Sequence, residues 1–195
     1  MRRLIPILLS SILLGVAFGQ ASGSSVAKVP VITVCEALHD LGRWNGKAII
    51  IVGGFDSTGE GFWLDEDCKD KLVTDGYTWP DAIWIEYISK EPPPPPMPTP
   101  LWDDKLLTAK LTLVQETTKL RVFEDHYYDD KWIAMFGRFE ARLPPQLRGI
   151  GRVGYGFGHL NGAPAQLISV EGAFKEWTRQ KNSWVGPGSR KWPIE

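Results

Sequence analysis

A proline run at residues 91–100, EPPPPPMPTP, sets the strongest limit on how this chain can fold. Proline has no amide hydrogen to donate and its ring clashes with a helical turn, so the run can be neither a helix nor a central strand. It predicts a stiff polyproline segment. A docking site for a proline-recognising module is the functional alternative. Because such modules are mostly intracellular, we expect an exposed spacer.

Apolar periodicity predicts regular elements on both sides of this spacer. In chain order they are a helix at 34–41, strands at 47–55, 61–67 and 81–88, a helix at 103–117, and strands at 131–143 and 165–177. This is the element order of an OB-fold, a five-stranded, partly open Greek-key barrel. We expect a mainly β, small OB-like barrel with one N-terminal helix and one helix between strands three and four. A small β-sandwich is the alternative.

The first residues are typical of a secretory signal peptide. Two arginines precede an apolar run of roughly 15 residues, which is followed by small residues. The run is short for a membrane span, which needs about 20 apolar residues, so cleavage is favoured over an uncleaved anchor. We expect a signal peptide at 1–19, a flexible leader at 20–30, a single domain at 31–177 and a flexible tail at 178–195. The expected location is periplasmic or extracellular.

The two cysteines, Cys35 and Cys68, fit an exported chain. An even cysteine count outside the cytosol favours a disulfide over two buried thiols. Cys35 lies in the first turn of the predicted N-terminal helix, and Cys68 follows the second predicted strand. We therefore expect a structural bridge between these two elements.

The charge of the chain bears on its partners. Loss of residues 1–19 removes Arg2 and Arg3 and no acid, so the net charge goes from −1 to −3. A mildly acidic domain lacks the excess of lysine and arginine with which proteins bind nucleic-acid phosphates. We expect no nucleic-acid partner, and no membrane contact after signal cleavage.

A glycine-rich segment, GIGRVGYGFGHLNG, occupies residues 149–162. Its G-x-G-x-x-G match lies between Pro145 and Pro164, where no helix can start, so it is not a dinucleotide fingerprint. The glycines let the backbone turn through unusual φ values. In an OB-like barrel this segment and the loop at 56–60 would frame the ligand face. Tyr155 and His159 are therefore candidate ligand-binding residues.

Catalytic, metal and cofactor sites are not predicted. His159 has no histidine at a metal-binding or hydrolase spacing. The acidic groups at 65–70 and 124–130 lack the EF-hand pattern. We expect His159 to hydrogen-bond neighbouring backbone, and the two acidic groups to form solvated turns.

Nine tryptophans are present, and two lie on strands that are predicted to be neighbours. Trp63 shares one side of its strand with Asp65, and Trp84 shares one side of its strand with Glu86. If the strands pair, an aromatic face bordered by acid results, at the place where OB-folds bind ligands. Trp63 and Trp84 are therefore candidate ligand-binding residues. The alternative is that they cover the barrel or pack under the proline segment.

Several short motifs resemble a group of poorly characterised secreted bacterial proteins with OB-fold-like architecture. They are CEAL, GRWNGKAIIIVGGF, GFWLDEDC, IAMFGRFEARL and GFGHLNGAPAQLISVEGA, and they extend from about residue 31 to residue 172. The resemblance implies the fold and the compartment but no activity. We expect a non-catalytic binding domain for a protein or an envelope glycan. A secreted hydrolase with an unrecognised site and a single-stranded nucleic-acid-binding OB domain are the alternatives.

Overall fold

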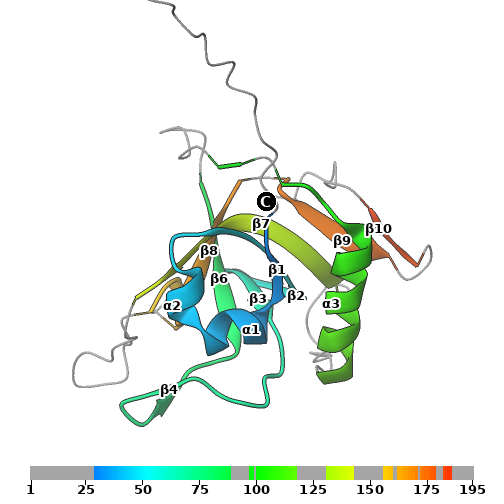
Figure 1. Ribbon diagram of the computed structural model, residues 1–195. Helices are drawn as coiled ribbons and strands as arrows, with labels where there is room; N and C mark the ends of the chain where they lie inside the picture. Colours follow the sequence, from blue (N-terminus) through cyan, green and yellow to red (C-terminus); the bar gives the residue numbers. More distant parts are fainter. Residues whose placement is uncertain are drawn as a thin grey trace, which may run out of the picture.

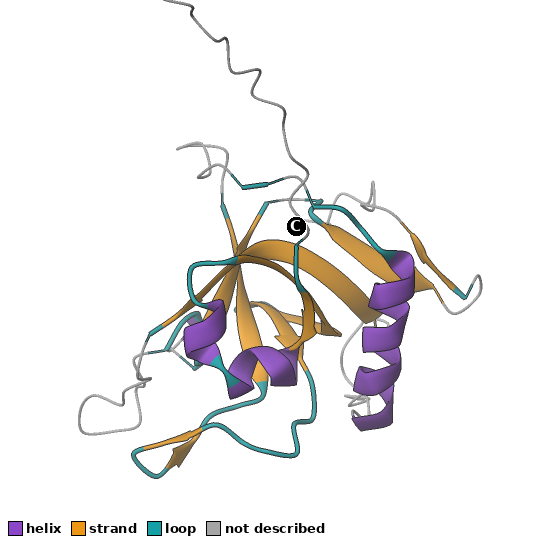
Figure 2. Ribbon diagram, viewed as in Figure 1, coloured by secondary structure: helices purple, strands orange, loops and turns teal. Residues whose placement is uncertain are grey.

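The chain folds around a mainly β core (Figures 1 and 2). The computed structural model describes residues 29–88, 97–98, 100–117, 131–142, 156–159, 162–170, 172–178 and 182–185. The strands are β1 (Val31–Thr33), β2 (Ala48–Thr58), β3 (Gly61–Asp65), β4 (Val73–Thr74), β5 (Tyr77–Thr78), β6 (Ala82–Tyr87), β7 (Lys131–Ala141), β8 (Ala165–Ser169), β9 (Phe174–Thr178) and β10 (Ser183–Val185). The helices are α1 (Val34–His39), α2 (Leu41–Trp44) and α3 (Asp104–Thr117).

Five strands close into a barrel. β2 pairs with β3, β3 with β6, β6 with β8, β8 with β7, and β7 with β2. Of these five pairs, only β6–β8 is parallel. Alternate side chains fill the interior, among them the fully buried Ile49, Ile51, Leu64, Ile83, Phe139 and Leu167. The prediction of a mainly β chain with a five-stranded barrel is confirmed.

β2 and β7 extend the barrel into a larger sheet. Both strands have 11 residues, and each pairs with two partners along one edge. β1 pairs in parallel with residues 50–52 of β2, on the edge that β3 occupies from Gly54 onward. β8 pairs with residues 138–141 of β7, and β9 pairs with residues 133–135 along the same edge. β10 in turn pairs with β9. Because the long strands belong to both structures, the barrel and the sheet form one folded unit.

Two short helices close one end of the barrel, where the sequence predicted one helix. A capping box begins α1: Glu36 N donates to Thr33 Oγ1 at 3.2 Å and Thr33 N donates to Glu36 Oε2 at 2.8 Å. The helix ends at His39 because the Asp40 side chain accepts from Arg43 N at 3.0 Å and caps α2. The buried side chains of α1 and α2 pack into the barrel core; they are Val34, Ala37, Leu38, Leu41 and Trp44.

α3 forms a second layer on the outside of the sheet. Its buried side chains Leu107, Leu111 and Val114 pack in one cluster with residues of β1, β2, β7 and β10. Met97, from the predicted proline spacer, and Trp102 also pack against this cluster. The end of that segment therefore contacts the folded domain, whereas residues 91–96 lie outside the described residues.

The C-terminal part of the chain differs from the prediction in two places. The single strand expected at 165–177 is two strands, because a turn intervenes in which Ala173 N donates to Val170 O at 3.1 Å. Ser183–Val185, expected in the flexible tail, form β10. Trp184 of this strand is buried, and its indole Nε1 donates to Thr108 Oγ1 on α3 at 3.1 Å. The folded part thus extends beyond residue 177.

The predicted disulfide between Cys35 and Cys68 is confirmed, with an S–S distance of 2.03 Å. It joins α1 to the segment that follows β3. Cys35 N donates to Glu66 Oε2 at 2.8 Å, and Cys68 N donates to Asp81 Oδ2 at 3.0 Å. The bridge therefore holds the helical cap against the barrel wall.

A lysine lies beside this bridge, between two aspartates. Lys71 Nζ is 3.2 Å from Asp67 Oδ1 and also contacts Asp81 Oδ2. The hydrogen bond with Asp81 raises the pKa of Lys71 above its ordinary value of 10.5, burial opposes this shift, and Asp67 adds to it. The charged form of Lys71 is therefore stabilised in the folded protein.

Lys71→Met is expected to lower the free energy of unfolding at neutral pH. Because the folded-state pKa is raised, this contribution is fully present below pH 10.5 and is lost as the pH rises through the folded pKa. Urea denaturation of protein and variant across this range measures the effect. Lys69→Met, at an exposed lysine nearby, is the control. Equal stability of Lys71→Met and the parent at neutral pH would contradict the expectation.

Candidate functional site

A row of side chains crosses four neighbouring strands on the outside of the barrel. Trp63 on β3 is paired with Trp84 on β6, Trp84 with Gln166 on β8, and Gln166 with Glu140 on β7. Their chain neighbours point into the core, so these four side chains share the outer face. The two strands that carry the candidate tryptophans therefore pair, as the sequence analysis supposed.

Trp84 is packed into this face. Its ring centroid lies 5.0 Å from that of Trp63 at an interplanar angle of 83°, and its Nε1 donates to Glu86 Oε2 at 2.9 Å. A Cβ placed on either Gly61 or Gly158 would overlap the indole. Trp84 is 9% exposed as a result, whereas Trp63 is only half-buried. Of the two candidate residues, Trp63 is the one with surface to offer a partner.

The glycine segment supplies one of the two contacts that cover Trp84. Gly158 has a φ of +73°, which confirms a turn through positive φ in this segment. Phe157 N donates to Ala163 O at 2.8 Å and Ala163 N donates to Phe157 O at 3.2 Å, so the two ends of the turn are tied together. The segment therefore holds its position over Trp84 through its backbone.

His159 lies beside the β2–β3 turn. Its Nε2 is 3.5 Å from Glu60 Oε1, and both side chains are exposed. The structure thus brings three predicted features together, because Gly158 covers Trp84 and His159 reaches the loop that precedes β3. Tyr155, the fourth candidate residue, lies outside the described residues.

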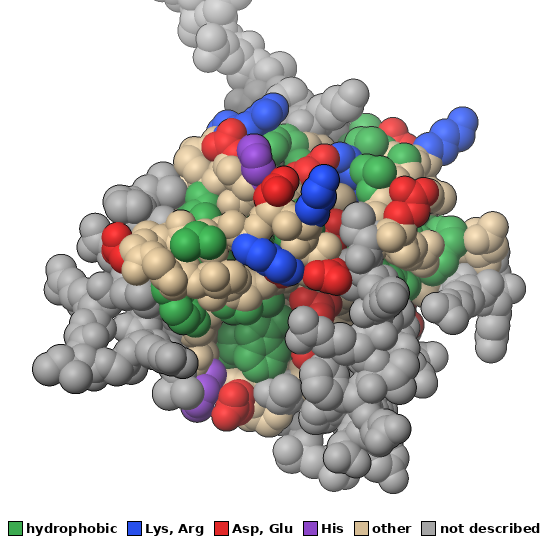
Figure 3. All heavy atoms as spheres, turned by 90° about the horizontal axis from the view of Figure 1, so that it is seen from below, with side chains coloured by type: hydrophobic (Ala, Val, Ile, Leu, Met, Phe, Trp, Pro, Cys, Tyr) green, Lys and Arg blue, Asp and Glu red, His purple; other side chains and the backbone are tan. Residues whose placement is uncertain are grey.

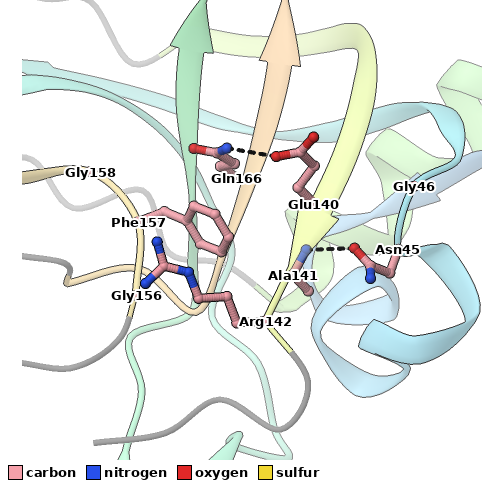
Figure 4. A pocket seen from close by; sticks show the side chains of 9 residues that line it. All are labelled: Asn45, Gly46, Glu140, Ala141, Arg142, Gly156, Phe157, Gly158 and Gln166. Carbon is pink, nitrogen blue, oxygen red and sulfur yellow. Dashed lines mark hydrogen bonds between the residues drawn. The ribbon is translucent and has the colours of Figure 1, made fainter. Parts of the chain in front are cut away.

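An open pocket of about 600 Å³ lies beside the glycine segment (Figure 4). Its walls are Asn45 and Gly46 in the α2–β2 turn, residues 140–142 at the end of β7, residues 156–158, and Gln166 of β8. Its volume falls within the range of about 300–1,000 Å³ that is usual for small-molecule sites. The pocket uses the predicted glycine segment as a wall.

Neighbouring groups hold the polar side chains of the pocket. Glu140 accepts from Gln166 Nε2 at 3.0 Å through one carboxylate oxygen, and the other oxygen lies 3.1 Å from Arg138 Nη2. Asn45 Oδ1 accepts from Ala141 N at 2.9 Å. The guanidinium carbon of Arg142 is 4.9 Å from the centre of the Phe157 ring. These contacts fix the positions of the polar groups before any ligand arrives.

The sequence analysis did not select the side chains of this pocket. The alternation of IAMFGRFEARL places Arg138, Glu140 and Arg142 on one face of a strand, opposite its buried residues. Three charged residues on the outer face next to a glycine-rich loop were the signal available. Phe157 and Gln166 are brought to this strand end by the folded structure.

Two groups of described residues have side chains of the kind used in catalysis or metal binding. Glu140 is the only carboxylate of the described pocket lining, and both of its oxygens are engaged. Cys35, Glu66 and Cys68 are the one group with metal-type ligand atoms close together in the described part of the chain. Because the two sulfurs are joined in a disulfide, they offer no thiolates.

Comparison with known proteins gives no relative for this chain. No protein-family model matches it, and no curated protein or solved structure matches it either. Within the described ranges, none of the helices is long and apolar enough to cross a membrane. Function is therefore inferred from the barrel and its pocket.

Proposed function

We propose that the protein is an exported, non-catalytic binding domain with an OB-like barrel, and that its ligand is a glycan of the cell envelope. The order β2-β3-β6-β8-β7 around the barrel, with α3 between β6 and β7 in the chain, supports an OB-like Greek key. In OB-folds the second and third strands and the loops beside them bind oligonucleotides and oligosaccharides. Here those strands are β3 and β6, and the glycine segment lies beside them.

The composition of the pocket is the observation that supports a glycan. A sugar ring presents apolar C–H faces and a rim of hydroxyl groups. Phe157 offers an apolar ring, and the Glu140–Gln166 pair of the same lining offers fixed donors and acceptors (Figure 4). This combination of an apolar surface with a few fixed polar groups suits a saccharide.

The alternatives of hydrolysis and nucleic-acid binding have less support. Most glycoside hydrolases flank the scissile bond with two carboxylates, and the described pocket lining contains Glu140 alone. Proteins that bind nucleic acid neutralise phosphates with lysine and arginine. The lower face of the molecule instead carries a hydrophobic centre bordered by charges of both signs (Figure 3).

A protein partner is the second candidate ligand, and the surface around Trp63 favours it. Trp63 is half-buried and lies opposite Asp56 on β2. Tryptophan is enriched among the residues that dominate the binding energy of protein interfaces. A Trp63→Ala variant that loses a protein partner but keeps glycan binding would favour this second function.

Phe157→Ala is expected to weaken glycan binding by about tenfold, because the loss of an apolar ring contact worth about 1.4 kcal/mol changes the affinity by that factor. The exported protein and its variant are compared on an array of cell-envelope glycans, and the best ligand is titrated by calorimetry. Leu101→Ala, at an exposed apolar residue outside the pocket, is the control. An array without any bound glycan would contradict the proposed function. Unchanged affinity of Phe157→Ala would show that the glycan does not bind in this pocket.

A further inference from the structure

We propose that the outer surface around Trp63 binds an arginine side chain of a partner protein, which stacks on the Trp63 ring and pairs with the Asp56 carboxylate. This surface lies on β2, β3 and β6. Asp56, Trp63 and the nearby Glu86 do not belong to the described lining of the pocket. The inference therefore goes beyond glycan binding and gives a chemistry to the protein partner of Trp63.

The outer face of these three strands is acidic and aromatic. The pairing of β3 with β2 and with β6 places one set of residues on this face; they are Gly54, Asp56, Gly61, Trp63, Asp65, Ala82, Trp84 and Glu86. The set contains three acids and two tryptophans, and no lysine or arginine. A surface with one sign of charge attracts a partner of the opposite sign, and the electron-rich faces of aromatic rings add to the preference for a cation.

Asp56 and Trp63 lie within reach of one guanidinium group. They are directly opposite each other on β2 and β3, and the Cβ atoms of such cross-strand pairs lie about 5 Å apart. Both side chains are half-buried, so each keeps surface for a partner. In the described part of the chain, neither Asp56 nor Glu86 forms an ion pair. A cation is therefore the missing charge on this surface.

The Trp63 ring is held in place before a partner arrives. Its centroid lies 5.0 Å from that of Trp84, at an interplanar angle of 83°. Trp84 is itself fixed, because its Nε1 donates to Glu86 Oε2 at 2.9 Å and its ring lies against Gly61 and Gly158. A ring that is already ordered loses little conformational freedom on binding, which favours affinity.

Arginine is the side chain that fits both groups. Its planar guanidinium can stack on an aromatic ring while its N–H fork binds a carboxylate. A lysine ammonium is a point charge without a flat face or a fork. An apolar side chain would cover Trp63 but would desolvate the Asp56 carboxylate without giving it a hydrogen bond, which is unfavourable. Tryptophan and arginine are also enriched among the residues that dominate the binding energy of protein interfaces.

Random peptides displayed on phage are the probe for this surface. They are selected on the immobilised exported protein and counter-selected on Trp63→Ala, and the enriched peptides are expected to share an arginine. The strongest binder is synthesised with arginine, with lysine, and with citrulline, which keeps the shape of arginine without its charge. Calorimetry is expected to show about tenfold weaker binding of the citrulline form, with the lysine form between the two.

Variants of the protein assign the contact to its residues. Asp56→Asn is expected to weaken the arginine peptide by about tenfold and to leave the citrulline peptide unchanged, because a charge-assisted pair needs both charges. Trp63→Phe keeps an aromatic ring and is expected to retain part of the affinity. Asp70→Asn, at an exposed aspartate in the segment that follows β3, is the matched control and should bind like the parent.

The failures of this inference and of the proposed function are distinguishable. Enriched peptides without a shared arginine, equal binding of the arginine and citrulline forms, or a selection that yields no binder would overturn the arginine-binding surface. Equal losses for both peptides in Asp56→Asn would overturn the role of Asp56. Should Trp63→Ala not fold, Asp56→Asn takes its place in the counter-selection. A glycan array without any bound member would overturn the proposed function and leave this inference standing.

Discussion

Gly158→Ala is expected to lower the free energy of unfolding by about 2–4 kcal/mol, because it combines an unfavourable backbone conformation with overpacking. The φ of Gly158 is +73°, a region that residues with a Cβ adopt at a cost. The same Cβ would overlap the indole of Trp84, which is buried and held by Trp63 and Glu86. Either the glycine segment or the tryptophan has to move. Urea denaturation of the variant beside the parent measures the loss.

Two other glycines separate the backbone cost from the overlap. Gly76 has a φ of +76°, and a Cβ added there would meet no atom within 4 Å, so Gly76→Ala carries the backbone cost alone. Gly162 lies in the same loop as Gly158 without a positive φ, and its Cβ would meet only His159 O at 3.5 Å. We expect the loss of stability to increase from Gly162→Ala to Gly76→Ala to Gly158→Ala. A Gly158→Ala protein as stable as Gly162→Ala would show that the segment does not press on Trp84.

Gly158→Ala is also expected to change the shape of the pocket and to reduce glycan binding. Phe157 precedes Gly158 in the chain, and its backbone pairs with Ala163. A displaced Gly158 therefore displaces the ring that stacks with Arg142. Reduced glycan binding by Gly158→Ala, under conditions in which the variant remains folded, would link the cover of Trp84 to the binding site.

The elements of the fold that the sequence predicted well are those with local signals. The capping box of Thr33 and Glu36 and the alternation along residues 82–87 depend on neighbours a few positions apart. β10 was missed because Ser183–Val185 is short and its stability comes from β9 and α3. Such contacts between distant parts of the chain leave no periodicity in a segment of three residues.

The candidate site also has one part that the sequence indicates and one part that depends on the folded structure. The sequence shows the alternation of the two strands that carry Trp63 and Trp84, and these strands pair although residues 66–81, with the β4–β5 hairpin, lie between them. The Glu140–Gln166 pair instead depends on the register between β7 and β8, which are joined through the glycine-rich stretch. A shift of one residue in that register would turn either side chain into the core. The pocket therefore depends on the barrel, which brings the ends of these strands together.

Removal of the disulfide is the second change with a large expected effect. The double variant Cys35→Ser/Cys68→Ser is expected to lose about 3–4 kcal/mol of unfolding free energy, the chain-entropy value for a closed loop of this length. The two cysteines are separated by 33 residues, and this loop includes α2, β2 and β3. Without the bridge, the unfolded chain gains freedom and α1 depends on packing and on the Glu66 contact to stay on the barrel. The double variant avoids the free thiol that a single substitution would leave.

Guanidinium denaturation compares the double variant with the parent, and parent protein treated with a reductant serves as the control. Reduction should bring the parent close to the double variant, because both lack the same covalent link. The midpoint should fall in both cases while the folded barrel persists at low denaturant. Intact mass after alkylation tests the bridge itself. Two alkylated thiols in unreduced protein, or a double variant as stable as the parent, would mean that α1 is held by packing alone.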